Sequence, residues 1–205
     1  MSERKPSEPV PGEPEELTAK TQKLPVMNPS PPEVSEEFRA QQEDVRHMIA
    51  ADAPLSVILS RLVLMIEGQT PDMLGSILLL SEDGNHVRHA VAPSLPESYV
   101  KAIDGSPIGP KHGSCGTAMF RGKPVNVSDI LTDPLWDDYR QYAAPIGLRA
   151  CWSTPILSSK GKVLGSFAMY YREPRSPDGE EQYLTDVATK LAAEAIEHKL
   201  HRQPK

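Results

Sequence analysis

The order of apolar patterns along the chain limits its fold more than any other feature. Residues 38–51 and 55–66 place apolar side chains at helical spacing, and so does the last segment, which ends near Arg202. Apolar runs of strand length lie between these helices, mostly as adjacent pairs within 73–92 and 148–171. Paired strands flanked by terminal helices predict an α+β fold rather than repeated βαβ units.

Turn and cap residues divide these segments further. A short helix is expected over 96–103, and a single strand over 124–128. Asp52 is expected to cap the helix over 55–66, and Ser176 to cap the last helix. We expect the long terminal helices to cover one face of a central antiparallel sheet, which leaves the other face to hold a ligand pocket.

Proline divides the chain into two regions of different composition. Residues 1–37 hold eight of the 21 prolines, and their eight Glu against four Lys and Arg carry −4 of the formal net charge of −6. Such a segment has too few apolar side chains to offset the entropy lost on ordering. Residues 1–37 are therefore expected to be a disordered, acidic, proline-rich tail, and residues 38–205 to form one domain.

Composition excludes several classes of protein. The negative net charge argues against a nucleic-acid partner, because phosphate binding needs clustered Lys and Arg. No apolar run approaches the roughly 18–20 residues that span a bilayer, and the N-terminus lacks the apolar stretch of a signal peptide. Two cysteines without an export signal are expected to be reduced thiols. These observations predict a cytoplasmic protein with no membrane partner, and no motif identifies a metal or a cofactor.

Several motifs together resemble the GAF domain of bacterial sensory proteins. They are IGPKHGSCGTA at 108–118, DILTDPLWDDY at 129–139, GLRACWSTPI at 147–156 and GKVLGSFAMYYREPRSP at 161–177. The resemblance covers about residues 55–200 in the same order. It implies a ligand pocket on one face of an antiparallel sheet, and terminal helices that pair between subunits and signal to an attached output domain. No output domain follows Lys205, so the chain is expected to be a stand-alone GAF protein.

Ligand signatures of particular GAF branches are absent or incomplete. The Asn-Lys pair of cyclic-nucleotide-binding members is missing, because none of the three asparagines precedes a lysine. The Cys-His attachment site of many bilin-binding members is missing as well, since Cys115 precedes Gly116 and Cys151 precedes Trp152. Cys115 matches one cysteine of the branch that reduces free methionine-R-sulfoxide, but the catalytic cysteine of that branch has no counterpart.

The Gly-rich turn and the aromatic loop supply the candidate ligand-binding residues. The turn residues share a place at a helix start, where free backbone N–H groups suit an anionic or carbonyl group. They are Gly113, Ser114, Cys115, Gly116 and Thr117. The loop gathers three of the eleven aromatic residues of the chain, with polar residues beside them for selectivity. These loop candidates are Trp136, Tyr139 and Tyr142, with Asp129, Asp133 and Arg149.

The two thiols carry a separate hypothesis. Cys115 is expected near a helix N-terminus, where the partial positive charge favours a thiolate. Cys151 is expected on a strand beside Trp152. Either both cysteines are small buried residues, or they are redox-active and oxidation joins or modifies them near the mouth of the pocket.

Together the patterns predict a sensory GAF domain that binds an unidentified small molecule. It is expected to signal through a homodimer of its terminal helices or through a separate signalling protein. The apolar faces of 38–51, 55–66 and 184–196 exceed what one sheet covers, which favours the homodimer. The chain is not expected to be an enzyme. Two alternatives stay open: a thiol-dependent reductase or redox sensor, and a pure protein-interaction module.

Overall fold

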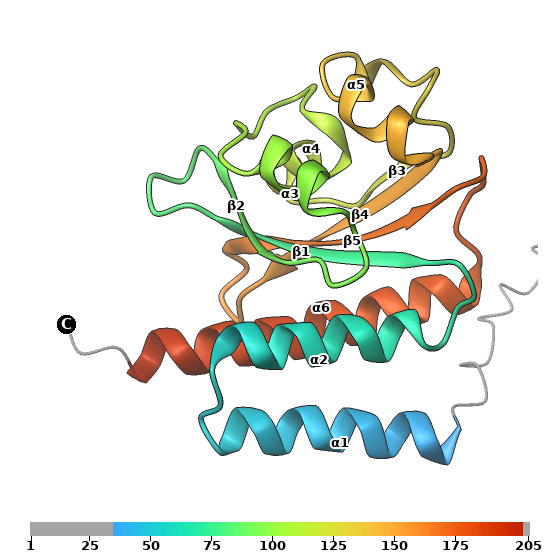
Figure 1. Cartoon of the computed structure of the whole chain (residues 1–205). Helices are drawn as coiled ribbons and strands as arrows, with labels where there is room; N and C mark the ends of the chain where they lie inside the picture. Colours follow the sequence, from blue (N-terminus) through green and yellow to red (C-terminus); the bar gives the residue numbers. More distant parts are fainter. Residues whose placement is uncertain (1–34, 203–205) are drawn as a thin grey trace, which may run out of the picture. The chain divides into compact units, whose positions relative to one another are not determined.

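The computed structural model describes residues 35–202. A five-stranded sheet crosses this region, and every neighbouring pair of strands is antiparallel (Figure 1). In their order across the sheet, the strands are β2 (Val87–Val91), β1 (Leu74–Leu80), β5 (Val163–Tyr171), β4 (Ala150–Leu157) and β3 (Val125–Val127). The expected α+β fold with a central antiparallel sheet is therefore confirmed.

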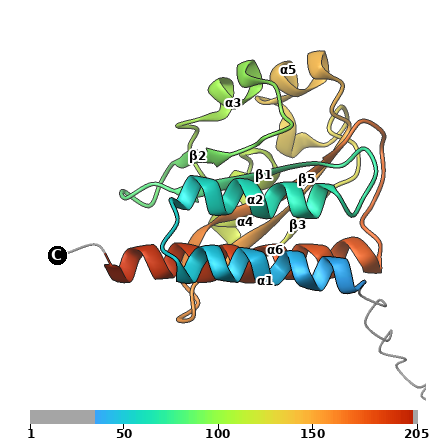
Figure 2. The same cartoon turned by 60° about the horizontal axis from the view of Figure 1, so that its bottom comes forward.

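Three long helices lie on one side of the sheet. They are α1 (Glu36–Ala50), α2 (Leu55–Glu67) and α6 (Gly179–Arg202). The helices α2 and α6 lie directly on the sheet, and α1 packs against both of them from the outer side (Figure 1 and Figure 2). The expected tail over 1–37 lies outside the described residues, except that its last three residues, from Ser35, cap and begin α1.

Short helices and loops cover the opposite face. They are α3 (Glu97–Ile103), α4 (Gly113–Arg121), α5 (Arg140–Ala143) and the 3-10 turns η1 (Pro134–Trp136) and η2 (Ala144–Ile146). Because β5 is the central strand, its side chains alternate between two apolar cores. Phe167, Met169 and Tyr171 belong to the core with α2 and α6, whereas Ala168 and Tyr170 belong to the core with α3 and α4.

The turn between α1 and α2 differs from the expectation that Asp52 caps α2. Pro54 takes the position before α2 instead, with the extended backbone that its ring favours. Asp52 has a left-handed backbone, with φ of 56°, and its carboxylate binds Lys199 in α6. The hydrogen bond from Lys199 lowers the pKa of Asp52. Asp52 therefore ties the α1–α2 turn to α6 rather than capping α2.

The start of α6 differs from the expected Ser176 cap. Asp178 and Glu181 form a reciprocal capping box. The Glu181 amide donates to Asp178 Oδ1 at 2.9 Å, and the Asp178 amide donates to Glu181 Oε2 at 3.0 Å. The Ser176 hydroxyl instead forms a hydrogen bond with the hydroxyl of the residue that follows β3. Glu181 is 2% exposed, accepts a hydrogen bond from Tyr171 and pairs with Arg175 at 2.9 Å, so it joins the end of β5 to α6.

The close approach of β1 and β5 requires a glycine at position 165. A Cβ atom built on Gly165 would lie 2.2 Å from the carbonyl oxygen of Leu78 in β1. A side chain there would push the two central strands apart. By contrast, a Cβ atom on Gly179, the first residue of α6, meets no atom within 4 Å.

We expect Gly165→Ala to destabilise the domain by about 2–4 kcal/mol, because the clash is with backbone and no side-chain rotation relieves it. Gly179→Ala is the matched control. It is expected to be neutral or to stabilise the domain by up to ~1 kcal/mol, since alanine is the better helix former. Urea unfolding followed by circular dichroism measures both changes. Equal effects of the two substitutions would contradict the clash.

Candidate functional site

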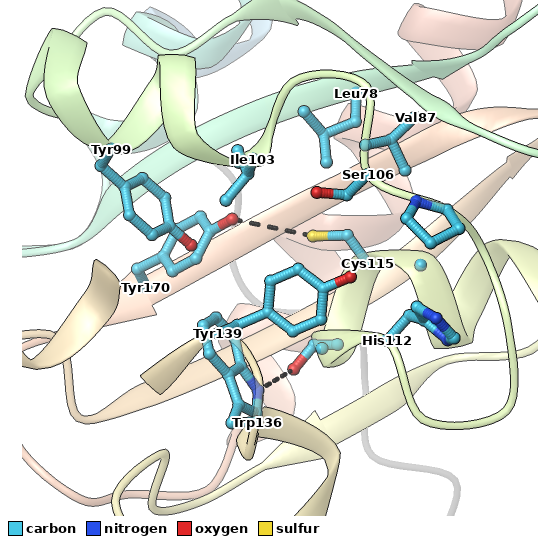
Figure 3. A pocket seen from close by; sticks show the side chains of 14 residues that line it. Leu78, Val87, Tyr99, Ile103, Ser106, His112, Cys115, Trp136, Tyr139 and Tyr170 are labelled. Carbon is cyan, nitrogen blue, oxygen red and sulfur yellow. Dashed lines mark hydrogen bonds between the residues drawn. The ribbon is translucent and has the colours of Figure 1, made fainter. Parts of the chain in front are cut away.

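A small cavity lies between the sheet and the chain that covers it, on the face opposite the long helices (Figure 3). Its volume is about 30 Å³, which is room for one or two water molecules. Its apolar lining is Leu78, Val87, Ile103 and Pro107, and its aromatic lining is Tyr99, Trp136, Tyr139 and Tyr170. The remaining lining residues are Ser106, His112, Gly113, Ser114, Cys115 and Gly116.

The first turn of α4 forms one wall of the cavity. Gly113 begins the helix with a left-handed backbone, with φ of 59°, and a Cβ atom there would lie 3.8 Å from the Tyr139 ring. A Cβ atom on Gly116 would lie 3.0 Å from His112 Cβ and 3.2 Å from the carbonyl oxygen of Pro107. The two glycines therefore let this turn lie close to the aromatic loop and to the segment before α4.

The Ser114 hydroxyl connects three elements at the inner end of this wall. It donates to the carbonyl oxygen of Cys151 in β4 at 3.0 Å. It accepts from Trp136 Nε1 of η1 at 3.1 Å, which is the dashed line at Trp136 in Figure 3. Ser114 and Trp136 are both buried. Each bond satisfies a polar group that has no access to water, so α4, the sheet and the aromatic loop are held together.

Aromatic rings form two further walls. The rings of Tyr99 and Tyr170 meet edge to face, with centroids 6.0 Å apart. Tyr139 is half-buried, which places it on the solvent side of the cavity, and burial raises its pKa. Its ring is tilted against that of His112, with centroids 6.4 Å apart.

Both thiols lie under the cavity and close to each other. Cys115 lines the cavity and is 7% exposed, whereas Cys151 is fully buried in β4. Cys115 Sγ lies 3.7 Å from the Tyr170 hydroxyl. A hydrogen bond with the Cys151 thiol lowers the pKa of Cys115 to about 7, against the effect of burial, while burial raises the pKa of Cys151. Both cysteines are free thiols.

Asp129 and Arg149, expected to provide polar selectivity, lie away from the cavity. Arg149 donates to both carboxylate oxygens of Asp129 at 3.1 Å, and this bonding lowers the pKa of Asp129. Next to the pair, the Ile130 amide donates to the Arg149 carbonyl oxygen at 2.6 Å. The pair therefore closes the base of the loop that carries the aromatic residues.

Three other candidates also point elsewhere. Tyr142 is 38% exposed and does not line the cavity. Thr117 lies one turn into α4, so its amide is inside the helix, and its hydroxyl accepts from the His112 amide at 3.0 Å. Asp133 caps η1 by accepting from the Leu135 amide at 2.8 Å. The candidates that do line the cavity are Gly113, Ser114, Cys115, Gly116, Trp136 and Tyr139.

Part of the lining was not predicted from the sequence. Tyr170 belongs to it because alternate residues of β5 face the cavity, and strand alternation is the signal that would have found it. Tyr99 belongs to the inner face of the short helix α3. Ser106 and His112 come from irregular segments, where no periodic pattern predicts which way a side chain points.

Comparison with known families decides the identity of the fold. The model of the GAF domain family matches residues 33–196. The chain belongs to the GAF domain family. The resemblance based on the motifs at 108–118 and 147–156 is therefore confirmed.

Individual GAF relatives differ in what they do. The methyl sulfide methyltransferase-associated sensor of Methanosarcina acetivorans is 39% identical over 164 residues, which are 80% of this chain and only 16% of that protein. The GAF domain of a phosphoenolpyruvate-protein phosphotransferase from Coxiella burnetii superposes with a TM-score of 0.63 at 17% identity, covering 80% of this chain and 95% of that one. The free methionine-R-sulfoxide reductase of Neisseria meningitidis, solved with its substrate, has a TM-score of 0.62 at 17% identity over 83% and 96% of the two chains. At these identities the two structures show the fold alone.

Two further observations concern the described part of this GAF protein. Within residues 35–202, no three His, Cys, Asp or Glu side chains are grouped so that they would hold a metal ion. In the same range, no helix combines the length and the apolar character needed to cross a bilayer.

We expect Ser114→Ala to destabilise the GAF domain by about 1–3 kcal/mol, because it leaves the buried Trp136 Nε1 without its partner and removes a hydrogen bond to the Cys151 carbonyl oxygen. Ser128→Ala is the matched control. Its hydroxyl bonds only the exposed Ser176, so the change is expected to stay within about 0.5 kcal/mol. Urea unfolding followed by tryptophan fluorescence measures both. A loss no larger than that of the control would show that the Ser114 bonds contribute nothing.

Proposed function

We propose that this GAF domain is a sensory domain that binds a small molecule in the cavity beside α4. The observation that carries the proposal is the meeting of aromatic side chains with a helix start at one buried site. Trp136 and Tyr139 both face the first turn of α4. Apolar cavities with a few converging polar groups are typical of ligand sites. The sensor name of the M. acetivorans relative supports the same role.

The ligand is expected to be small, with an apolar or aromatic body and one polar end. Leu78, Val87 and Ile103 supply apolar contacts. Ser106 and the first turn of α4 supply the polar contacts, because they line the cavity, whereas His112 Nδ1 lies against Gly109, outside the lining. With a volume of about 30 Å³, the cavity admits a larger molecule only if Tyr139 moves outward.

The strand β5 offers a route from the cavity to α6. Tyr170 lines the cavity, and its chain neighbour Tyr171 belongs to the core on the other face. There the Tyr171 hydroxyl donates to Glu181, and the guanidinium of Arg175 lies 4.3 Å from the centre of the Tyr171 ring. A ligand that shifts β5 would therefore alter the contacts of α6. We propose that α6 passes this change to a second copy or to a separate signalling protein.

The homodimer is proposed on a smaller surface than the sequence suggested. Phe38, Val45 and Ile49 of α1 are buried in the core with α2 and α6 of the same chain, so this stripe is not free for a partner. Val57 and Leu64 of α2 are each 49% exposed, and their spacing places them on one face of the helix. These two residues are the proposed centre of contact with a second copy.

Two alternatives make different predictions from the same cavity. For a pure interaction module we expect a filled pocket, and the small volume of the cavity favours this alternative. For a reductase of free methionine-R-sulfoxide we expect turnover that requires Cys115. The chain is not proposed to be an enzyme, because the catalytic cysteine of that GAF branch has no counterpart in the sequence.

The first test is a pair of mass spectra of freshly purified protein, one native and one denaturing. We expect a mass excess in the native spectrum that vanishes on denaturation and whose value identifies the ligand. Adding that ligand back is expected to raise the melting temperature by mass action. The native mass also counts the subunits, so a single subunit would contradict the homodimer. Bare protein at the sequence mass would favour the interaction module instead.

The aromatic wall is tested with two tyrosines of the same segment. Tyr139→Ala is expected to lower ligand occupancy about tenfold, because it removes an aromatic contact from the cavity. Tyr142→Ala is the matched control: Tyr142 lies outside the cavity and is expected to leave occupancy unchanged. The ligand-bound fraction in native mass spectra at equal concentrations measures both. An equal loss in the two variants would mean that the loop, and not the cavity wall, matters.

A further inference from the structure

We propose that Cys115 and Cys151 form a peroxide-sensitive thiol pair at the floor of the cavity, with Cys115 as the nucleophile and Cys151 as the resolving thiol. This inference goes beyond the proposed function, because the pair shares the cavity but needs no resident ligand. The oxidant is hydrogen peroxide or another small hydroperoxide.

The fold brings the two thiols together from α4 and β4. Cys151 and Tyr170 are paired residues of β4 and β5, and both belong to the core under α4. Cys115 Sγ lies 3.7 Å from the Tyr170 hydroxyl. Ser114, the residue before Cys115, donates to the carbonyl oxygen of Cys151 at 3.0 Å. The backbones of α4 and β4 are thus joined next to the two cysteines, and the Cys151 thiol is close enough to Cys115 to lower its pKa.

Hydroxyl donors converge on the Cys115 sulfur. Ser76 donates to the Tyr170 oxygen at 3.3 Å, which leaves the Tyr170 O–H to donate to Cys115. Ser153 and Ser166 are buried, and within residues 35–202 their hydroxyls have no hydrogen-bond partner of good geometry. Both lie close enough to Cys115 to lower its pKa. A thiolate at Cys115 would accept from these donors, whereas a buried hydroxyl without an acceptor is unfavourable.

The position of Cys115 in α4 also favours the thiolate. Cys115 is the third residue of α4, where the N–H groups of the first turn carry partial positive charge. The other titratable side chains that line the cavity are Tyr99, His112, Tyr139 and Tyr170. None of the lining residues is a carboxylate, so no fixed negative charge at the cavity opposes the thiolate.

The size of the cavity selects the oxidant. Cys115 is reached through a volume of about 30 Å³, which admits a molecule of the size of one or two waters. Hydrogen peroxide is in this range, whereas a bulky disulfide would first need Tyr139 to move outward. The structure therefore favours oxidation by a small peroxide over thiol–disulfide exchange with a large partner.

The reaction proceeds in two steps. The Cys115 thiolate attacks one peroxide oxygen, the O–O bond breaks, and the second oxygen leaves as hydroxide and takes up a proton to form water. Cys115 is then a sulfenic acid. The Cys151 thiol attacks the Cys115 sulfur, an S–S bond forms, and the sulfenic oxygen leaves as water with the proton of Cys151. Two thiols and one peroxide thus give a disulfide that links α4 to β4 and two waters, and an external dithiol reverses the change.

The test uses the full-length protein, reduced, freed of reductant and then treated with hydrogen peroxide. We expect the loss of both alkylatable thiols, a mass lower by two hydrogen atoms, and a linked peptide pair that contains Cys115 and Cys151. Cys151→Ser is expected to stop at a sulfenic acid on Cys115 that dimedone captures when the oxidised protein is unfolded, and Cys115→Ser to leave Cys151 unmodified. Two surviving thiols, overoxidation of Cys115 without linkage, or a disulfide between chains would each overturn the proposal.

A second experiment tests whether the Ser153 and Ser166 hydroxyls stabilise the Cys115 thiolate. The rate at which hydrogen peroxide oxidises Cys115 is followed across a pH series, with the remaining thiols alkylated after unfolding and identified by peptide mass. The double substitution Ser153→Ala and Ser166→Ala is expected to slow this oxidation at neutral pH about tenfold and to move its midpoint up by about one pH unit. Ser128→Ala, at an exposed hydroxyl, is the control and is expected to change nothing. An unchanged profile in the double variant would overturn the role of these hydroxyls. Neither experiment needs a ligand, so both remain decisive if the mass spectra show bare protein.

Discussion

The walls of the cavity depend on the two hydrogen bonds of the Ser114 hydroxyl. It donates to β4 and accepts from Trp136, so one small side chain holds α4, the sheet and the aromatic loop in place. Because all the partners are buried, breaking either bond leaves a polar group without water. The first turn of α4, and Cys115 with it, is therefore fixed at the inner wall of the cavity. The outer wall is Tyr139, which is half-buried.

The central strand β5 serves both faces of the sheet. Its alternation sends Tyr170 toward the cavity and Cys115, while Tyr171 contacts Glu181 at the start of α6. Glu181 is a buried carboxylate that is acceptable only because it is paired with Arg175 and hydrogen-bonded. Neighbouring residues of one strand thus reach the proposed ligand site and the proposed output helix. This arrangement gives a change at the cavity a short physical path to α6.

Local patterns predicted the elements but not the contacts between them. Apolar periodicity was sufficient for the strands and the long helices, because each of them must bury a face. The caps assigned to Asp52 and Ser176 were wrong, since a cap residue is decided by competing partners. Asp52 is drawn to Lys199, and the capping box of Asp178 with Glu181 takes the place of Ser176.

By itself the sequence determined the α+β class, the GAF family and the short motifs that hold the turn of α4 and the aromatic loop, because those features lie in continuous stretches of chain. Only the tertiary structure decided that Cys115 meets Cys151 and Tyr170, and that Asp129 bonds Arg149 at the base of a loop. The physical reason is that burial preference is a property of each residue and is written in the pattern. A hydrogen bond needs two particular atoms, and distant segments bring those atoms together only once the sheet and α4 are in place.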